Sequence, residues 1–212
     1  PFLFDCYVRP RDRHLSPLSP PTLLSSYPTP PRAPPLRPAG FAPEVVVSGV
    51  DEDGVAGVSA RAAACTLAER KAAAVAARLA AEPGRDSAPL VVGCDSVLTF
   101  GDEVRGKPAS AEQATDWWRG YRGRTGTLVS GHAVIDVASG RRATGTAETT
   151  VRFGQPTDTQ IDAYVATGEP LAVAGGFTLD GYCAPFVDGI YGDHGTVLGL
   201  SLPLLRALLA EL

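Results

Sequence analysis

The placement of proline is the feature that most constrains how this chain folds. Twelve of its 19 prolines lie in the first 43 residues, and six of them fall within positions 28–38. An internal proline removes a helix hydrogen bond and clashes with the preceding turn, so this segment is predicted to be a loop or a polyproline stretch. Residues 1–21 lack a continuous apolar run of signal-peptide length. They are predicted to be a disordered extension before a domain that spans residues 22–212.

Length and charge set broad limits on what the chain does. It has 212 residues with 19 basic and 23 acidic side chains, which suits one domain or two small lobes. A formal charge of -4 disfavours a protein that coats a nucleic-acid polymer. No apolar run approaches the roughly 18 residues of a membrane span, so no membrane partner is predicted. The four cysteines form no CxxC pair, which indicates reduced thiols and a cytoplasmic protein.

Hydrophobic periodicity predicts a mixture of strands and helices after the proline-rich segment. Runs typical of strands occur at 23–26, 44–47, 90–94, 127–137 and 143–153, the last two joined by a hairpin at Ser139-Gly140. Runs typical of helices occur at 59–81, from a capping box at Ser110 and Gln113 through Trp118, at 158–166 and at 203–212. Residues 171–200 are Gly-rich and predict only brief strands. The chain is therefore predicted to be an α/β or α+β domain with one large sheet.

Lysine is scarce in this chain, which draws attention to the two that are present. Of the 19 basic residues, 17 are Arg, and the lysines are Lys71 and Lys107. Lys107 lies between Gly106 and Pro108, which would present one compact ammonium from a rigid turn, as a phosphate site requires. Lys71 lies in the middle of the predicted 59–81 helix. The alternatives are an ordinary turn with a solvated lysine for Lys107 and a solvated helix face for Lys71.

Two carboxylate positions are candidates for metal or catalytic chemistry. Asp95 lies in the apolar run VVGCDSV, where a carboxylate is costly unless it is paired or binds a metal. Glu52 belongs to the acidic cluster Asp51-Glu52-Asp53, which follows a predicted strand, where carboxylate ligands of Mg²⁺ are often found. The alternatives are a structural aspartate at a strand end for Asp95 and a polar turn for the cluster.

Arginines and histidines complete the set of candidate side chains. Arg119, Arg122 and Arg124 alternate with glycines, so this loop either clamps phosphates or is an exposed helix end whose cations favour the helix dipole. His132 and His194 have no partner at metal-ligand or triad spacing and are interpreted as structural. The lysines, arginines and two carboxylate positions together describe a polyphosphate–metal pocket.

An ordered set of short motifs resembles one known family. The motifs are SGVDED, LAERKAAAVA, VVGCDSV, GKP, GRTG, SGH, TTVRF, YVATGEPL, AGGF, LDG and VLGLSLPLL. From about residue 23 to the end, the chain resembles the Maf family of septum-formation-related nucleoside triphosphate pyrophosphatases. The resemblance implies an α/β fold of the Maf and inosine-triphosphatase type, with a mixed sheet, flanking helices and two lobes around a central cleft.

The resemblance also implies an activity and roles for residues. The family hydrolyses a nucleoside triphosphate to the monophosphate and pyrophosphate with a divalent metal, Mg²⁺ or Mn²⁺. By position, Asp95 would bind the metal and help activate the attacking water, and Glu52 would be a second ligand. Lys71 and Lys107 would neutralise charge on the phosphates. Homodimers occur among the relatives, so a homodimer is also implied.

The substrate-binding positions depart from the family pattern. Members open with a loop of the type S-x-S-P-R-R, whose place is taken here by a proline-rich stretch. Thr29 stands in place of the second serine, and only Arg32 keeps the family's residue type. Asp180 stands where a glutamine is usual, and Arg124 completes the predicted substrate-binding set. The altered loop keeps open the alternative of a catalytically weakened nucleotide-binding homologue that acts through partners in cell division. An enzyme of the inosine-triphosphate pyrophosphatase type is a third hypothesis.

Overall fold

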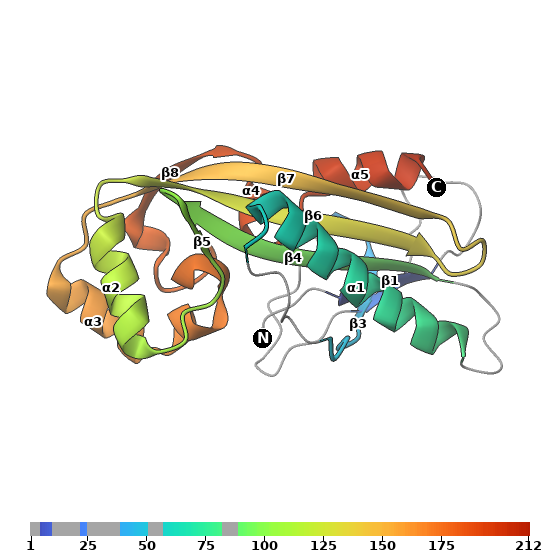
Figure 1. Ribbon diagram of the computed structural model, residues 1–212, viewed down its shortest axis with the longest axis horizontal. Helices are drawn as coiled ribbons and strands as arrows, with labels where there is room; N and C mark the ends of the chain where they lie inside the picture. Colours follow the sequence, from blue (N-terminus) through green and yellow to red (C-terminus); the bar gives the residue numbers. More distant parts are fainter. Residues whose placement is uncertain (1–4, 10–21, 25–38, 51–56, 82–88) are drawn as a thin grey trace.

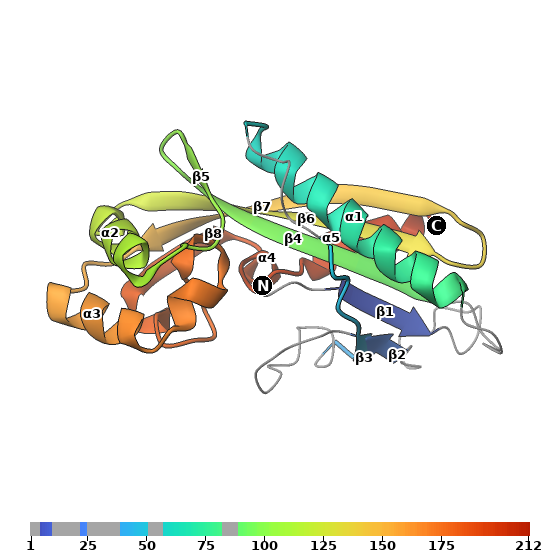
Figure 2. The same ribbon diagram turned by 60° about the horizontal axis from the view of Figure 1, so that its bottom comes forward.

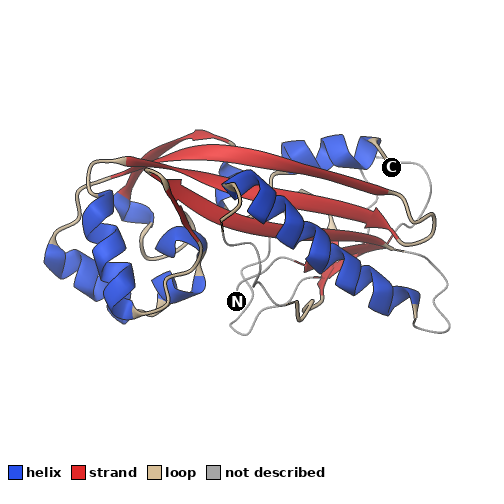
Figure 3. Ribbon diagram, in the orientation of Figure 1, coloured by secondary structure: helices blue, strands red, loops and turns tan. Residues whose placement is uncertain are grey.

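A single mixed sheet organises the computed structural model, which describes residues 5–9, 22–24, 39–50, 57–81 and 89–212 (Figure 3). Its strands follow the order β2-β3-β1-β4-β6-β7-β8, and β5 pairs with β4. The strands are β1 (Asp5–Arg9), β2 (Thr22–Leu24), β3 (Ala42–Val45), β4 (Leu90–Phe100), β5 (Glu103–Arg105), β6 (Thr125–Asp136), β7 (Arg142–Phe153) and β8 (Val187–Gly192). The β2–β3 pair is parallel, whereas β4, β6, β7 and β8 pair antiparallel in turn. The α/β prediction is therefore confirmed.

The α-helices begin at residues whose side chains cap them. They are α1 (Ala60–Ala80), α2 (Ala111–Tyr121), α3 (Asp158–Ala166), α4 (His194–Val197) and α5 (Leu202–Ala210), with short 3-10 helices η1 (Glu169–Ala172), η2 (Ala174–Gly176) and η3 (Ala184–Phe186). At α2, the Ser110 hydroxyl accepts from the Gln113 N–H, but the Gln113 side chain accepts from Ala109 rather than from Ser110. The predicted box is thus half formed there. A complete capping box stands at α3, between Thr157 and Gln160.

The described part of the N-terminal segment is a strand. Within the predicted disordered extension 1–21, Asp5–Arg9 forms strand β1 and pairs antiparallel with β4, while the rest of that extension lies outside the described residues. Backbone pairing accounts for this strand, because an edge of β4 offers unpaired hydrogen-bonding groups to any extended segment. The strand predicted at 44–47 begins two residues earlier, as β3. The proline-rich 28–38 segment lies outside the described residues.

Two lobes lie along the sheet and share its three longest strands, β4, β6 and β7 (Figures 1 and 2). One lobe carries α1 and α5, and the other carries α2, α3, β5 and the short helices that follow α3. The second lobe has an aromatic core of Phe100, Trp118, Tyr121, Phe153, Tyr164 and Phe177. The two predicted lobes are observed, whereas the cleft between them stays a prediction.

Helix α1 lies unusually close to the sheet because small residues face each other. Ala64, Ala68 and Ala72 recur every four residues on α1 and are fully buried. Opposite them are two glycines, and a Cβ added at Gly131 of β6 would lie 2.2 Å from the Ala64 carbonyl oxygen. A Cβ at Gly93 of β4 would lie 2.4 Å from the Ala68 carbonyl oxygen. Only glycine is therefore compatible with this helix–sheet distance.

The opposite face of the sheet carries α5, which packs on Val92 and Cys94 of β4. Beside them His132 is fully buried, and its Nε2 accepts a hydrogen bond of 2.8 Å from the Ser201 N–H at the start of α5. Because Nε2 accepts, the ring proton sits on Nδ1, which faces the Ser130 carbonyl oxygen at 3.2 Å. Burial lowers the pKa of His132 to about 4. This geometry confirms that His132 is structural.

Exchanging glycine for alanine tests the close approach of α1. Gly131→Ala is expected to destabilise the protein by at least about 2 kcal/mol, because the new methyl group overlaps the backbone of α1. Gly120→Ala in α2 is the matched control, since its Cβ would meet nothing within 4 Å. Helix propensity should make that change stabilising by about 0.5–1 kcal/mol. Urea unfolding measures both, and equal effects would contradict the described packing.

Acidification is expected to weaken the fold through His132. The folded state keeps the ring neutral down to about pH 4, whereas the unfolded chain takes up a proton below about pH 6.5. The contribution of His132 is therefore complete above pH 6.5 and is lost as the pH falls toward 4, by up to about 3 kcal/mol. Urea unfolding of the wild type and of His132→Gln across this range measures it. The variant should lose this part of the pH dependence, and identical slopes would refute the assignment.

Candidate active site

A buried ion pair joins α1 to the sheet. The Lys71 ammonium donates to Oδ1 of Asp95, and the two side chains are 0% and 6% exposed. Lys71 comes from the middle of α1, and Asp95 from the middle of β4. Asp95 is paired with Gly131 across the β4–β6 ladder. The same close approach that Gly93 and Gly131 permit therefore brings the lysine down to the carboxylate.

This pair settles two alternatives that the sequence left open. Lys71 is not on a solvated helix face, and Asp95 is not at a strand end, because β4 continues for five residues beyond it. Removing two charged groups from water costs several kcal/mol per ion, and the attraction between Lys71 and Asp95 compensates for roughly that cost. Such a pair contributes little net stability. Its position is better explained by chemistry, because buried charged groups are often found at functional sites.

A hydrogen-bonded chain supports β4 from the side opposite α1. The Ser96 and Ser130 hydroxyl oxygens are 2.6 Å apart, and Ser130 donates to the Thr196 carbonyl oxygen of α4 at 2.9 Å. The Asp193 carboxylate in turn caps α4 by accepting from the backbone N–H groups of Gly195 and Thr196. The residue next to Asp95 is thus fixed by contacts that the sequence motifs alone did not reveal.

Lys107 and Asp180 belong to the second lobe. Lys107 is half-buried in the loop between β5 and α2, where the carbonyl oxygen of its neighbour Gly106 accepts from the Gly175 N–H at 2.7 Å. Asp180 is exposed, and its carboxylate accepts from the Thr178 hydroxyl at 2.5 Å. The structure therefore connects the predicted phosphate lysine, through the 174–176 turn, to the segment that carries Asp180.

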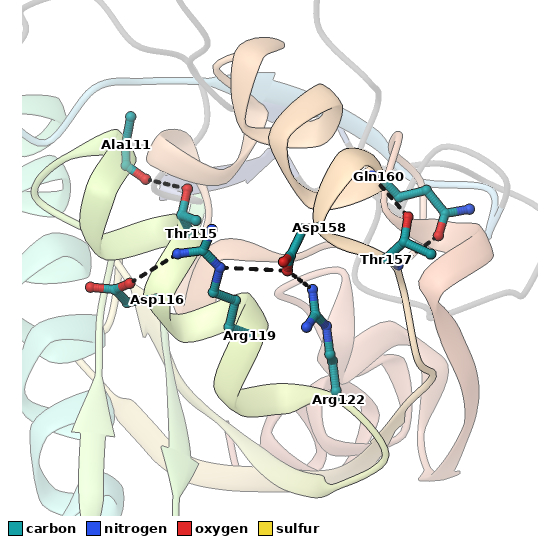
Figure 4. Close-up of polar contacts among 8 residues, drawn as sticks. All are labelled: Ala111, Thr115, Asp116, Arg119, Arg122, Thr157, Asp158 and Gln160. Carbon is teal, nitrogen blue, oxygen red and sulfur yellow. Dashed lines mark hydrogen bonds and ion pairs between the residues drawn. The ribbon is translucent and has the colours of Figure 1, made fainter.

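The arginines predicted to clamp phosphates make contacts within the protein. Arg119 and Arg122, at the end of α2, both pair with Asp158 in the first turn of α3, Arg119 at 3.6 Å (Figure 4). The hydrogen bond from Arg122 lowers the pKa of Asp158. The exposed Arg124 guanidinium lies 4.4 Å from the centre of the Phe100 ring. The helix-end interpretation holds for Arg119 and Arg122, whereas substrate binding by Arg124 stays a prediction.

The donor groups of the described residues limit how a metal could be held. Within the part of the chain that the structure describes, no group of three or more His, Cys, Asp or Glu residues is arranged around a common point. Asp95 fits Mg²⁺ or Mn²⁺ nonetheless, because Mg²⁺ is often held by one or two carboxylates together with substrate phosphates. The predicted second ligand Glu52 and the predicted substrate contacts Thr29 and Arg32 lie outside the described residues.

Comparison with known proteins identifies the class to which this fold and site belong. The family described as Maf-like protein matches residues 25–212. A protein of Streptomyces coelicolor named nucleoside triphosphate pyrophosphatase is 60% identical over 177 residues, which is 84% of each chain. A protein of the same name from Salinispora tropica is 54% identical, over 87% of this chain and 80% of its own.

A third relative shows that the similarity extends over nearly the whole chain. The nucleoside triphosphate pyrophosphatase of Nocardia farcinica is 44% identical over 198 residues, which is 90% of this chain and 92% of the relative. The chain therefore belongs to the Maf family. Among the described residues, no helix is long and apolar enough to cross a membrane.

A double-mutant cycle tests whether Lys71 and Asp95 depend on each other. Lys71→Met or Asp95→Asn alone leaves one buried charge unpaired and is expected to cost about 3–5 kcal/mol. The double variant should cost much less than the sum. The exposed pair of Arg61 on α1 with Glu148 on β7, at 2.8 Å, is the control and should couple by about 0.2–1 kcal/mol. Additive losses at Lys71 and Asp95 in urea unfolding would contradict a buried pair.

Proposed function

We propose that this protein hydrolyses a nucleoside triphosphate to the nucleoside monophosphate and pyrophosphate, an activity that cleanses the nucleotide pool. The observation that carries the proposal is the buried Lys71–Asp95 pair in a chain that belongs to the Maf family. Relatives that are 44–60% identical over most of the chain bear the name nucleoside triphosphate pyrophosphatase. This places the enzyme among the hydrolases that act on acid anhydrides.

The reaction needs a water at the α-phosphorus and charge neutralisation on the group that leaves. A water oxygen forms a bond to the α-phosphorus while the bond between that phosphorus and the α,β-bridging oxygen breaks, and the electron pair leaves with pyrophosphate. Asp95 orients the water and takes up its proton. Lys71, held at Asp95 in a buried position, would place a positive charge beside the phosphates.

Lys107 acts on the leaving group. A compact ammonium on a rigid loop is a point charge, which suits the oxygen on which negative charge develops better than a planar guanidinium does. Preorganised charges of this kind are worth roughly 10²–10³ in rate for each group removed. Thr29, Arg32, Arg124 and Asp180 remain the proposed contacts to the rest of the substrate.

A divalent metal fits this proposal. Asp95 and Glu52 would hold Mg²⁺ or Mn²⁺, which supplies charge neutralisation on the phosphates and lowers the pKa of bound water. A cytoplasmic location is also proposed. It is supported by the free thiols of Cys65 and Cys183. Assembly as a homodimer stays a prediction from the family resemblance.

A panel of nucleoside triphosphates tests the activity and its chemistry together. With Mg²⁺ or Mn²⁺, the wild type should release pyrophosphate and the monophosphate, rather than the diphosphate and orthophosphate. Asp95→Asn should abolish turnover, and Lys107→Met should lower it by about 10²–10³-fold. Arg206→Ala removes an exposed charge on α5 and is the control, with turnover unchanged.

Each result of the panel has a definite meaning. Absence of pyrophosphate release from every nucleotide would refute the proposed activity. If nucleotides then raised the melting temperature, the weakened nucleotide-binding homologue would be the better description. Preferential hydrolysis of deaminated purine triphosphates would favour the inosine-triphosphate type. The order of rates across the panel gives the base preference.

A further inference from the structure

Three buried aromatic side chains hold one short turn in the second lobe. The turn is Gly175-Gly176, with φ angles of 66° and 70°. The Tyr121 hydroxyl donates to the Gly175 carbonyl oxygen at 2.9 Å. The Trp118 indole N–H and the Tyr164 hydroxyl both donate to the Gly176 carbonyl oxygen, at 2.8 and 3.1 Å. Both carbonyl groups of the turn are therefore fixed by donors from α2 and α3.

The turn leaves no room for a side chain. A Cβ at Gly175 would lie 2.7 Å from the Cβ of Leu98 on β4, and the positive φ disfavours any other residue. Trp118 and Tyr121 are fully buried, and Tyr164 is nearly so. Burial raises the pKa of Tyr121 to about 12, so its hydroxyl remains a donor across the physiological pH range. The turn is thus held by packing against β4 and by permanent hydrogen bonds.

The same turn lies beside both neighbours of Lys107. The Gly175 N–H donates to the Gly106 carbonyl oxygen at 2.7 Å. On the other side of the lysine, Pro108 is buried, and its ring lies near the turn, because a Cβ built at Gly176 would be 3.6 Å from the Pro108 Cγ. The backbone before Lys107 is therefore fixed by its hydrogen bond to Gly175, and through the turn by the three aromatic donors.

We propose that Tyr121 is a positioning residue for Lys107: its hydrogen bond to Gly175 fixes the turn on which the Gly106–Pro108 backbone rests. This inference depends on the proposed role of Lys107 at the phosphates. Tyr121 itself touches no substrate. Its role is to keep the lysine ammonium where negative charge develops, because misplacing a charged group by about 1 Å costs up to about 10²-fold in rate.

The Tyr121→Phe variant isolates the hydrogen bond. It retains the aromatic ring, which is stacked on Phe153 at 4.5 Å between centroids and 12° between planes. Its kcat/KM is expected to fall by about 10-fold or more, mainly in kcat. Introduced into Lys107→Met, the same change should alter the residual kcat/KM by less than about twofold. Tyr191→Phe is the control, because Tyr191 is 86% exposed, and it should have no effect in either background.

A second measurement separates this inference from the proposed activity. Inorganic pyrophosphate is titrated into the four proteins of the cycle by calorimetry, and Tyr121→Phe should weaken its binding only when Lys107 is present. If the wild type binds pyrophosphate with this coupling but hydrolyses no nucleotide, the positioning role stands and the proposed activity fails. If the wild type is active and Tyr121→Phe lowers kcat/KM equally with and without Lys107, the role is merely structural and the inference is overturned.

A milder variant covers the case in which Tyr121→Phe does not fold. Tyr164→Phe removes one of two donors to the Gly176 carbonyl oxygen and leaves the Trp118 donor in place. It is expected to show the same dependence on Lys107 with a smaller loss in kcat. Independence from Lys107 in this variant would overturn the inference as well.

Discussion

The close contact between α1 and the sheet is the constraint on which the rest of the structure depends. Small residues on both sides allow it, with an alanine stripe on the helix and glycines at 93 and 131 on the strands. The contact excludes water from the space between helix and sheet, so a charged side chain placed there needs a charged partner. Lys71 and Asp95 meet this need for each other, and their position follows from the packing around them.

The energetics of this pair favour function over stability as the reason for its presence. Two apolar residues of similar size would fill the same space without the cost of dehydrating two ions. A chain that retains the ion pair therefore accepts a cost in folding free energy at this point. In the proposed activity, the pair would supply a lysine and a carboxylate that are already oriented and dehydrated, and such groups would need little rearrangement when phosphate charge arrives.

Local patterns in the sequence predicted local structure well. The alanine-rich 59–81 run is α1, the hairpin around Ser139-Gly140 joins β6 to β7, and the helix predicted at 158–166 matches α3. The motif reading also singled out Lys71 and Asp95 as candidate residues. It did not show that the two side chains meet, because that depends on the rotation of α1 over the sheet, which is a tertiary property.

Other features could not be predicted from the sequence because they also depend on tertiary contacts. The Gly-rich 171–200 stretch predicted brief strands, and it contains one, β8, but it also forms short 3-10 helices and the short helix α4, which were not predicted. Their conformations are set by donors from distant elements, such as Trp118 and Tyr121 at the Gly175-Gly176 turn. Arg119 and Arg122 carried a signal for phosphate binding, yet they pair with Asp158, a partner 36 or more residues away in the chain.

The long strands shared by the two lobes also have a mechanical consequence. The strands β4, β6 and β7 have 11 or 12 residues each, which at about 3.3 Å per residue makes each of them about 35–40 Å long. They are bonded side by side over most of this length, so bending one would strain the ladders of all three. Loops between domains act as hinges in many enzymes, whereas the lobes of this protein are joined by a continuous sheet that resists bending. We therefore expect little closure of one lobe on the other, so that differences between bound nucleotides would be met by side chains and connecting loops.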